Sequence, residues 1–354
     1  MKVDLKPADT GARAIYSFRA KAPLRLSFAG GGTDVPPFPE REGGLVLSAT
    51  IDRYAYGTLR PRMDRQISIE SLDFGMEVNW GIDEAMIFDG KLDLVKAAIR
   101  KFGQPGWNGF DLFLHSNAPP GSGLGSSSTM MVTLMGLLRE YHVLPISDYE
   151  IARLAYVVER EELGLKGGLQ DHYASTFGGF NFIEFGADQV IVNPLRIDAH
   201  TVNELEMSLI LAYTGKTRQS DHIIEDQTSR FVDQDADALA GLRMQKDLAV
   251  AMKNALLQRK LTTFGSLLGE AWEYKKKMSP RVTNPFIDEA YEVACKKGAL
   301  GGKVTGAGGG GYMLFYCPFE KKHRVAEALL SMDASITEFS FDIQGLRSWR
   351  YEEA

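Results

Sequence analysis

The stretch that most constrains the fold of this chain is residues 119–128, which read PPGSGLGSSS. Glycines at alternate positions let the backbone turn tightly and bring its N–H groups close to a ligand. The alternating segment 110–115 predicts a strand before this loop, and the apolar stripe after Ser128 predicts a helix whose start the serines cap. A glycine-rich turn that leads into a helix N-terminus is typical of an anion site, most often one for phosphate.

This loop differs from the two common phosphate-binding motifs. No lysine follows the glycines as in the Walker A motif, and the third glycine comes one position too early for the dinucleotide-binding fingerprint. A loop of glycine and serine can also simply turn a chain. Phosphate binding is therefore the favoured of two interpretations, and the other motifs must decide between them.

Composition narrows the class of protein. A length of 354 residues favours two domains, and 44% hydrophobic with 24% charged residues is ordinary for globular proteins. A net charge of −6 argues against a nucleic-acid-binding protein. Cys295 and Cys317 form neither a disulfide framework nor a metal-site spacing. Neither a secretory signal nor a membrane-spanning stretch is visible, so we expect a soluble cytoplasmic protein with no nucleic-acid or membrane partner.

A second glycine-rich stretch follows a predicted strand near the start of the chain. Residues 24–28 alternate between apolar and polar side chains and then run into GGGTD, which is residues 30–34. Such a strand end allows a ligand to approach the backbone and supplies Asp34 as an acceptor for hydroxyl groups. A plain turn with Asp34 as its cap is an equally good interpretation of these residues alone.

Two carboxylates stand out around the next helix. A capping box at Ser147 and Glu150 begins a helix predicted to run to residue 163, and Glu159 lies at the edge of its apolar stripe. Glu159 is either half-buried and in need of a cation or simply solvated. Asp171 comes soon after a pair of glycines that interrupts the helix, and it is either a functional carboxylate or a helix N-cap. We expect His172 to be packed or solvated rather than a metal ligand.

The C-terminal half adds a third glycine-rich loop. Residues 206–213 predict a buried strand, and Lys216 and Arg218 beyond it could hold a phosphate or form a charged loop. Four adjacent glycines at 308–311 are costly in backbone entropy, which indicates close backbone approach rather than a simple hairpin. Residues 336–341 predict a final strand, and the basic cluster 275–277 predicts a solvated helix face.

Taken together, three glycine-rich loops and two carboxylates 12 positions apart resemble the GHMP small-molecule kinases. The resemblance rests on APLRLSFAGGGTD (22–34), PPGSGLGSSS (119–128) and KVTGAGGGG (303–311), in the family's order, and it covers nearly the whole chain from about residue 19. It implies a two-domain α/β (α+β) fold, with an S5-domain-2-like N-terminal domain over 1–203 and a ferredoxin-like C-terminal domain over 204–354. The active site would lie between the two domains.

The resemblance also implies a set of site residues and the cofactors ATP and Mg²⁺. Ser127 and Glu159 match the family's magnesium ligands, Asp171 its catalytic aspartate, and Arg25 the cation beside the transferring phosphate. The expected ATP-binding residues are Pro120, Gly121, Ser122, Gly123, Leu124, Gly125, Ser126, Ser127 and Ser128. The expected substrate-binding residues are Gly31, Gly32, Thr33, Asp34, Asp171, Lys216, Arg218, Gly308 and Gly309.

The substrate is a small sugar or sugar phosphate by the same resemblance. Galactokinases carry an acidic residue and a histidine where this chain has Gly31 and Gly32, which argues against galactose. The segments LRLSFAGGGTD, YTGKTR and GLQDHYA look like the branch that phosphorylates O1 of D-glycero-D-manno-heptose 7-phosphate, with Lys216 and Arg218 as candidates for the 7-phosphate. A fucose- or galactose-type 1-kinase and a non-catalytic sensor with the same fold are the alternatives. The oligomeric state stays open, with a homodimer as one candidate.

Overall fold

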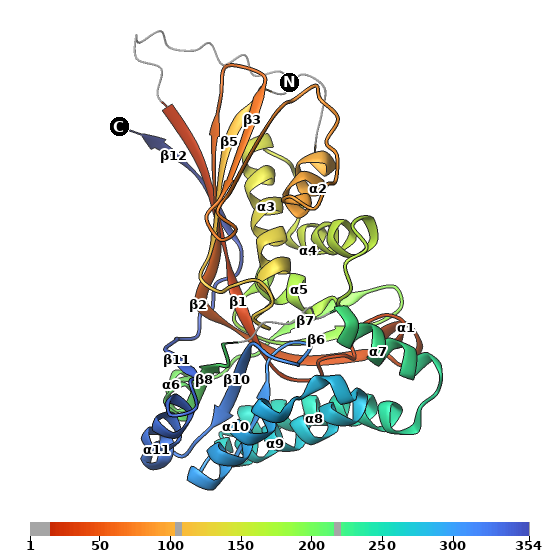
Figure 1. The fold of residues 1–354 in the computed structure, drawn as a ribbon, viewed down its shortest axis with the longest axis vertical. Helices are drawn as coiled ribbons and strands as arrows, with labels where there is room; N and C mark the ends of the chain where they lie inside the picture. Colours follow the sequence, from red (N-terminus) through yellow and green to blue (C-terminus); the bar gives the residue numbers. More distant parts are fainter. Residues whose placement is uncertain (1–14, 103–107, 216–220, 354) are drawn as a thin grey trace.

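The structure, a computed structural model, describes residues 15–102, 108–215 and 221–353. It contains two β-sheets with helices packed on them, so the mixed α/β fold predicted from the sequence is confirmed. The larger sheet occupies the upper part of the molecule in Figure 1, and the smaller sheet with a group of helices occupies the lower part. Among the described residues, no helix combines the length and the apolar character needed to cross a bilayer.

The first sheet contains eight strands: β1 (Ile15–Ala29), β2 (Gly44–Pro61), β3 (Gln66–Ser71), β4 (Met76–Gly81), β5 (Phe110–Ser116), β6 (Phe180–Phe185), β7 (Val190–Pro194) and β12 (Arg347–Glu353). Their order is β12-β1-β2-β5-β3-β4, with β6 between β2 and β7. Strand β2 pairs with β5 through its second half and with β6 through its first half. The only parallel pair among the described strands is β3 with β5. Strands β6 and β7 form an antiparallel hairpin.

Helices cover one face of this sheet (Figure 1): α2 (Asp93–Phe102), α3 (Ser126–His142), α4 (Asp148–Tyr156) and α5 (Gln170–Phe177). Helix α3 packs on β1 and β2 through buried side chains that include Met131, Leu134 and Leu138. The capping box of Ser147 and Glu150 is present at the start of α4. Helix α4 then continues as a π-helical segment, η1 (Val157–Glu162), rather than as the regular helix predicted to residue 163. Such π-turns often occur at functional sites.

The second sheet has four antiparallel strands in the order β11-β8-β10-β9: β8 (Leu209–Tyr213), β9 (Gly301–Val304), β10 (Tyr312–Tyr316) and β11 (Ser335–Thr337). The remaining helical segments are α1 (Phe38–Glu42), α6 (Ala199–Ser208), α7 (Asp221–Val232), α8 (Ala236–Leu257), α9 (Leu261–Met278), η2 (Pro280–Val282), α10 (Pro285–Lys297) and α11 (Phe319–Leu330). One apolar core joins both sheets through α8 and α9, with Phe28, Leu47, Leu211 and Phe264 fully or almost fully buried in it.

Two strand predictions in the C-terminal half are wrong in their extent. The strand predicted over 206–213 begins only at Leu209, because α6, capped by Asp198, continues through residue 208. The strand predicted over 336–341 pairs only through 337, and Phe341 instead bridges to Ile51 in the first sheet. The chain leaves the second sheet at this point and returns to the first, where β12 pairs antiparallel with β1.

Candidate active site

The glycine–serine loop between β5 and α3 has the conformation that its glycines require. Gly121, Gly123 and Gly125 have φ angles of 74°, 83° and 77°, in the left-handed region that favours glycine. The prediction that the serines cap α3 is wrong: the N-cap position is Gly125, and no side chain caps the helix. The first amides of α3 are therefore free of side-chain caps, which suits an anion at this end.

The residues predicted for ATP binding divide into two groups in the structure. The cavity beside the loop, with a volume of about 190 Å³, is lined by Gly121, Gly123, Gly125, Ser126, Ser127 and Ser128. Leu124 instead packs in the core, and its carbonyl accepts a hydrogen bond from Arg25 N at 3.2 Å. Ser122 is also fully buried, and its carbonyl accepts from Tyr312 N at 2.9 Å. Pro120 lines a second cavity next to the first.

The third glycine-rich loop lies against the first one, backbone to backbone. A Cβ on Gly306 would meet the Gly123 backbone at 2.9 Å, and one on Gly123 would meet the Thr305 carbonyl at 2.6 Å. The close backbone approach expected at residues 308–311 is confirmed by Gly311, where a Cβ would overlap with Ser122 O of the first glycine loop. Gly308 lines the cavity, whereas Gly309 is directed away and donates its N–H to Val282 O at 2.6 Å.

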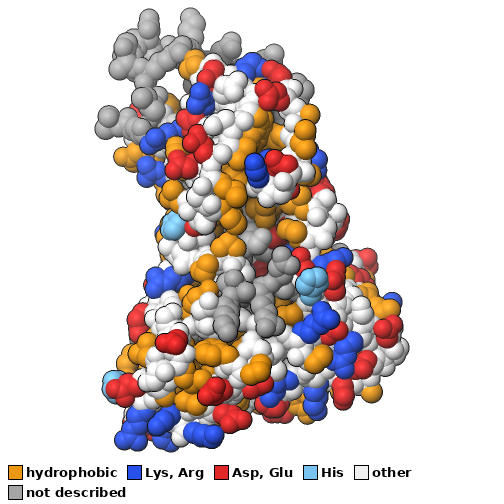
Figure 2. Space-filling view, in the orientation of Figure 1, with side chains coloured by type: hydrophobic (Ala, Val, Ile, Leu, Met, Phe, Trp, Pro, Cys, Tyr) orange, Lys and Arg blue, Asp and Glu red, His pale blue; other side chains and the backbone are white. Residues whose placement is uncertain are grey.

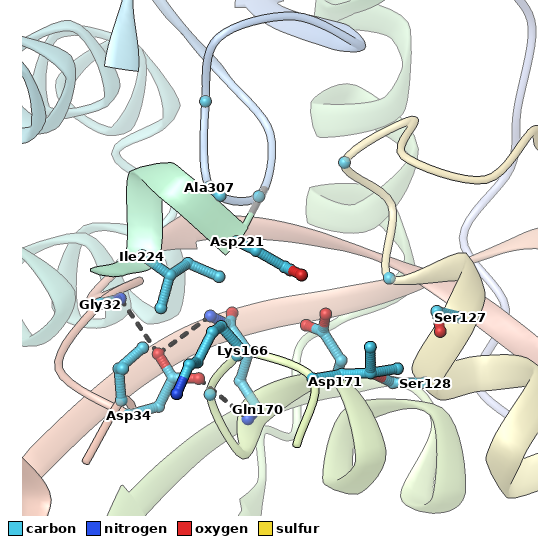
Figure 3. Close-up of a pocket in the computed structure, with 18 of the residues that line it drawn as sticks. Gly32, Asp34, Ser127, Ser128, Lys166, Gln170, Asp171, Asp221, Ile224 and Ala307 are labelled. Atoms are coloured by element: carbon cyan, nitrogen blue, oxygen red, sulfur yellow. Dashed lines mark hydrogen bonds between the residues drawn. The ribbon is translucent and has the colours of Figure 1, made fainter. Parts of the chain in front are cut away.

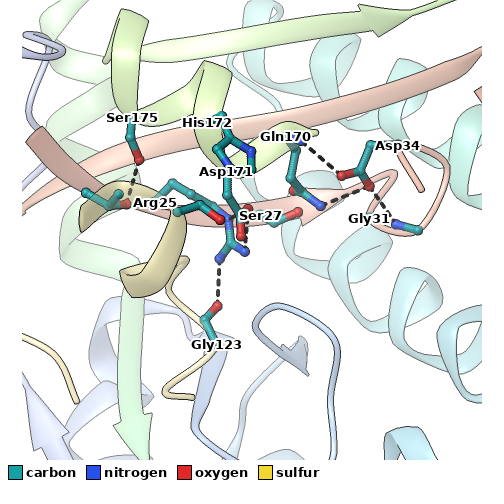
Figure 4. A network of polar contacts seen from close by, with 12 residues as sticks. Arg25, Ser27, Gly31, Asp34, Gly123, Gln170, Asp171, His172 and Ser175 are labelled. Atoms are coloured by element: carbon teal, nitrogen blue, oxygen red, sulfur yellow. Dashed lines mark hydrogen bonds and ion pairs between the residues drawn. The ribbon is translucent and has the colours of Figure 1, made fainter. Parts of the chain in front are cut away.

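Arg25 and Asp171 both line the cavity, and they form an ion pair with each other (Figure 4). The Arg25 Nε and Nη2 atoms both lie 2.7 Å from Asp171 Oδ1, and Nη1 donates to Gly123 O at 2.6 Å. Asp171 Oδ2 has no hydrogen-bond partner in the described part of the chain. Asp171 is the second residue of α5 and is not its N-cap. The arrangement fixes one carboxylate oxygen and leaves the other free to accept a proton.

Glu159 is fully buried, contrary to the expectation that it is half-buried or solvated. Its Oε1 accepts from Ser127 Oγ at 2.6 Å, and its Oε2 lies 2.6 Å from His172 Nε2 and 3.6 Å from Arg160 Nη2. Burial alone raises the pKa of Glu159, but the Arg160 charge and the hydrogen bonds from His172 and Ser127 outweigh it and lower the pKa to about 2. Glu159 is therefore ionised at neutral pH.

Ser127 and Glu159 offer a hydroxyl and a carboxylate oxygen side by side, which are hard donors suited to Mg²⁺. No group of three or more His, Cys, Asp or Glu side chains able to hold a metal occurs in the described segments. This donor set fits an ion that takes its other ligands from phosphate oxygens and water, as Mg²⁺ usually does. It does not fit an all-protein cage.

Asp34 lies at the other end of the cavity, also buried. Its carboxylate accepts hydrogen bonds from Gly32 N at 3.0 Å, from Gln170 N at 3.0 Å and from Gln170 Nε2 at 3.1 Å. Burial raises the pKa of Asp34, the Gln170 amide opposes this, and the charge of Asp171 adds to it. Figure 3 shows Asp34 and Gln170 at one end, Ser127 and Ser128 at the other, and Asp171 between them.

Gly32 lines the cavity, while Thr33 is buried and its Oγ donates to Gly30 O at 2.7 Å.

Several residues in or near the cavity were missed or misread in the sequence. Lys275 was predicted to be solvated but is buried and lines the cavity, because α9 turns this position inward. Lys303 is also buried, and its Nζ donates to Ser27 O at 2.8 Å. His172 was expected to be either packed or solvated, and it is packed. Its contact with Glu159 was not predicted. Lys216 and Arg218 lie outside the described residues.

A second cavity of about 260 Å³ adjoins the first and shares Ser126, Ser127 and Leu165 with it. Its wall is mainly apolar and includes Phe74, Leu92, Val95, Leu114 and Met130. Figure 2 shows apolar side chains gathered over this upper part of the molecule. An apolar slot next to a loop whose free amides suit an anion has the chemistry of a site for a nucleoside base.

Gly168 offers a test of the Asp34 end. A Cβ at this position would overlap with the Asp34 Oδ2 atom, so Gly168→Ala must displace that carboxylate or the loop that carries residue 168. The sequence resemblance implies an acceptor at Asp34 and ATP at the glycine–serine loop, so the KM for the acceptor is expected to rise on the order of tenfold, with a much smaller change in the KM for ATP. The control is Gly186→Ala, where the new Cβ would meet Gln189 O at an ordinary 3.5 Å. Equal increases in both KM values would place the effect of Gly168→Ala elsewhere.

Comparison with known proteins yields one family. The models described as GHMP kinases N terminal domain and GHMP kinases C terminal match residues 93–179 and 252–334. The chain is 40% identical to D-glycero-alpha-D-manno-heptose 7-phosphate kinase of Campylobacter jejuni, over 94% of this chain and 99% of that protein. It is 30% identical to L-fucokinase/L-fucose-1-P guanylyltransferase of Bacteroides fragilis, over 83% of this chain and 34% of that longer protein. A crystal structure of a D-glycero-D-manno-heptose 1-phosphate kinase from Bacteroides thetaiotaomicron aligns with a TM-score of 0.79 and 37% identity, over 94% of this chain and 98% of the other.

Proposed function

This chain belongs to the GHMP kinase family and is an ATP-dependent sugar kinase, and we propose that it transfers the γ-phosphate of ATP to the anomeric O1 of D-glycero-D-manno-heptose 7-phosphate. The product would be the 1,7-bisphosphate, a precursor for nucleotide-activated heptose. The observation that carries the proposal is the position of Asp171, which pairs with Arg25, between the serine end and the Asp34 end of one cavity. The sugar is suggested by the Campylobacter relative, which is similar over nearly its whole length.

In this proposal the serine end of the cavity holds the triphosphate. The glycine loop and the first turn of α3 offer backbone N–H groups and the positive end of a helix dipole to the phosphate oxygens. Ser127 and Glu159 would hold Mg²⁺, which neutralises charge on the phosphate oxygens when it is bound. The apolar cavity beside Ser126 would take the adenosine base.

Asp171 would act as the general base on the acceptor. Its free Oδ2 accepts the proton of the O1 hydroxyl while O1 forms a bond to the γ-phosphorus and the bond from that phosphorus to the bridging oxygen breaks. ADP leaves with the bridging oxygen. Arg25 keeps the Asp171 carboxylate in place and supplies a fixed positive charge beside the transferring group. An anomeric hydroxyl is more acidic than an ordinary alcohol, so a carboxylate is a sufficient base.

A panel of acceptors tests the proposed function. Purified protein with ATP and Mg²⁺ is assayed for ADP release with heptose 7-phosphate, unphosphorylated heptose, fucose, galactose and mevalonate. We expect heptose 7-phosphate to give the highest kcat/KM and a product phosphorylated at C1 by ³¹P NMR. Fucose as the preferred acceptor would favour the second candidate, which the Bacteroides fragilis relative supports. ATP binding without turnover of any acceptor would favour a sensor.

Lys216 and Arg218 remain our candidates for binding the 7-phosphate, because they follow β8 and carry two positive charges. Replacing both with alanine is expected to raise the KM for heptose 7-phosphate on the order of tenfold or more, with little effect on unphosphorylated heptose. The matched control replaces Lys296 and Lys297, which lie at the end of α10. Equal losses on both acceptors would mean that Lys216 and Arg218 do not bind the phosphate.

A further inference from the structure

The Asp34 end of the cavity holds polar side chains that the described protein leaves without good partners. The Lys275 ammonium is buried, and its hydrogen bond to Gly31 O is long, at 3.4 Å. Gln170 and Gln227 are only 8% and 6% exposed, and both line the cavity. Within the described residues, Gln170 Oε1 and Gln227 Nε2 have no hydrogen-bond partner. Because buried polar groups are nearly always hydrogen-bonded, these atoms indicate a ligand.

Lys275 differs from the neighbouring cations in what surrounds it. Burial lowers the pKa of Lys275 to about 8, although the charge of Asp34 opposes this. Arg25 is paired with Asp171 at 2.7 Å, and the Lys303 ammonium is turned to the Ser27 carbonyl. Two lysines, Lys166 and Lys275, are among the residues that line the cavity, and of these Lys166 is exposed whereas Lys275 is buried and feels the charge of Asp34.

We propose that Lys275, together with Asp34, Gln170 and Gln227, binds hydroxyl groups of the acceptor sugar remote from O1, and that Lys275 does not bind the acceptor's phosphate. The inference rests on the proposed function of the cavity. A hydroxyl group suits an ammonium beside a carboxylate, because it donates its proton to the carboxylate and accepts a hydrogen bond from the ammonium. A phosphate dianion at the same place would be repelled by Asp34.

This subsite would also orient the acceptor for reaction. Asp171 lies between the Asp34 end and the serine end of the cavity (Figure 3). A sugar that is held by its remote hydroxyls at Asp34 and Lys275 therefore has space to direct its O1 toward Asp171. Such positioning lowers the entropy cost of bringing O1 to the γ-phosphate.

The test compares Lys275→Met with wild type on two acceptors, heptose 7-phosphate and unphosphorylated heptose. Methionine has a similar length but no donor, so we expect kcat/KM for the acceptor to fall on the order of 10- to 100-fold, by the same factor for both sugars. The KM for ATP should stay within about twofold of wild type. The control is Lys277→Met, an exposed lysine on the same helix that stacks on Tyr274 at 4.6 Å, and it should behave as wild type.

Two results would overturn the proposal. A loss confined to the phosphorylated acceptor would mean that Lys275 binds the phosphate, and unchanged acceptor kinetics would mean that it binds neither part. If Lys275→Met does not fold, as judged by circular dichroism, the subsite is tested on the wild-type protein with modified acceptors. Monodeoxy heptose 7-phosphates that lack one hydroxyl other than O1 should include at least one with a loss on the order of tenfold, and the absence of any such loss would refute the subsite.

The same design separates a failure of this inference from a failure of the proposed function. If wild type turns over neither form of heptose, the proposed substrate is wrong. The Lys275→Met comparison is then made on the phosphorylated and free forms of whichever sugar the acceptor panel identifies. An equal loss on both forms would support the subsite, and a loss on the phosphorylated form alone would overturn it.

Discussion

Replacing Asp171 with asparagine is expected to lower kcat on the order of 10³-fold, while the affinity for ATP changes by no more than a few-fold. The asparagine side chain has nearly the same shape and retains an oxygen for the Arg25 guanidinium, so the pair of hydrogen bonds at 2.7 Å can largely persist. What is lost is the carboxylate oxygen that accepts the O1 proton, because an amide is not a base at neutral pH. Single-turnover kinetics measure the chemical step directly, and fluorescence titration with an ATP analogue measures nucleotide binding.

The control for this variant is Asp148→Asn, an aspartate that pairs with Arg139 at 2.8 Å on the surface. It removes the same charge from the protein without touching the cavity and should keep wild-type kinetics. Retention of most of the single-turnover rate by Asp171→Asn would remove the general-base role. The charge of Arg25 and the positioning of the two substrates would then account for catalysis.

Replacing Glu159 with glutamine is expected to raise the Mg²⁺ concentration required for half-maximal rate on the order of 10- to 100-fold. The Glu159 carboxylate is fully buried, and its pKa of about 2 means that it carries a full negative charge across the neutral range. Glutamine removes that charge from beside Ser127 and leaves Arg160 without its counter-ion at 3.6 Å. The measurement is initial rate against free Mg²⁺ at saturating ATP and acceptor.

The matched control for Glu159→Gln is Glu161→Gln, two residues along the same π-helical segment and on its exposed side. Its carboxylate pairs with Arg153 at 3.3 Å near the surface, so its Mg²⁺ requirement should equal that of wild type. Thermal denaturation shows whether Glu159→Gln also destabilises the fold through the unpaired Arg160. An unchanged Mg²⁺ dependence in a folded variant would contradict magnesium binding by Glu159.

The sequence predicts the fold well where local patterns determine the structure. The stretch 119–128 leads into α3, which begins at Ser126, and the alternation over 24–28 is part of β1. Both follow from the spacing of apolar side chains, which reflects the face that is buried. The serine cap was wrong because Gly125, with its left-handed backbone, already occupies the N-cap position. The extent of the strand predicted over 206–213 was wrong because an apolar run does not show where a helix gives way to a strand.

The site was only partly predictable, because burial of a charge depends on contacts between distant segments. Lys275 lies in a run of three lysines that looks like a solvated helix face, and only the packing of α9 shows that it is buried. The contacts of Glu159 with Ser127 and His172 likewise join three elements that are separate in the sequence. Family motifs indicated Glu159 and Asp171, whereas no local pattern indicated Gln170, Gln227 or Lys275.

The pairing of β1 with β12 has a consequence for how the molecule is made. On the ribosome, β1 emerges long before residues 347–353, so one of its edges stays bare while almost all of the remaining chain is synthesised. An uncovered strand edge can pair with other chains, and the delay lengthens the time in which a nascent polypeptide can aggregate. Shielding by a chaperone during translation would therefore matter more for β1 than for strands such as β6 and β7, whose partners follow within a few residues.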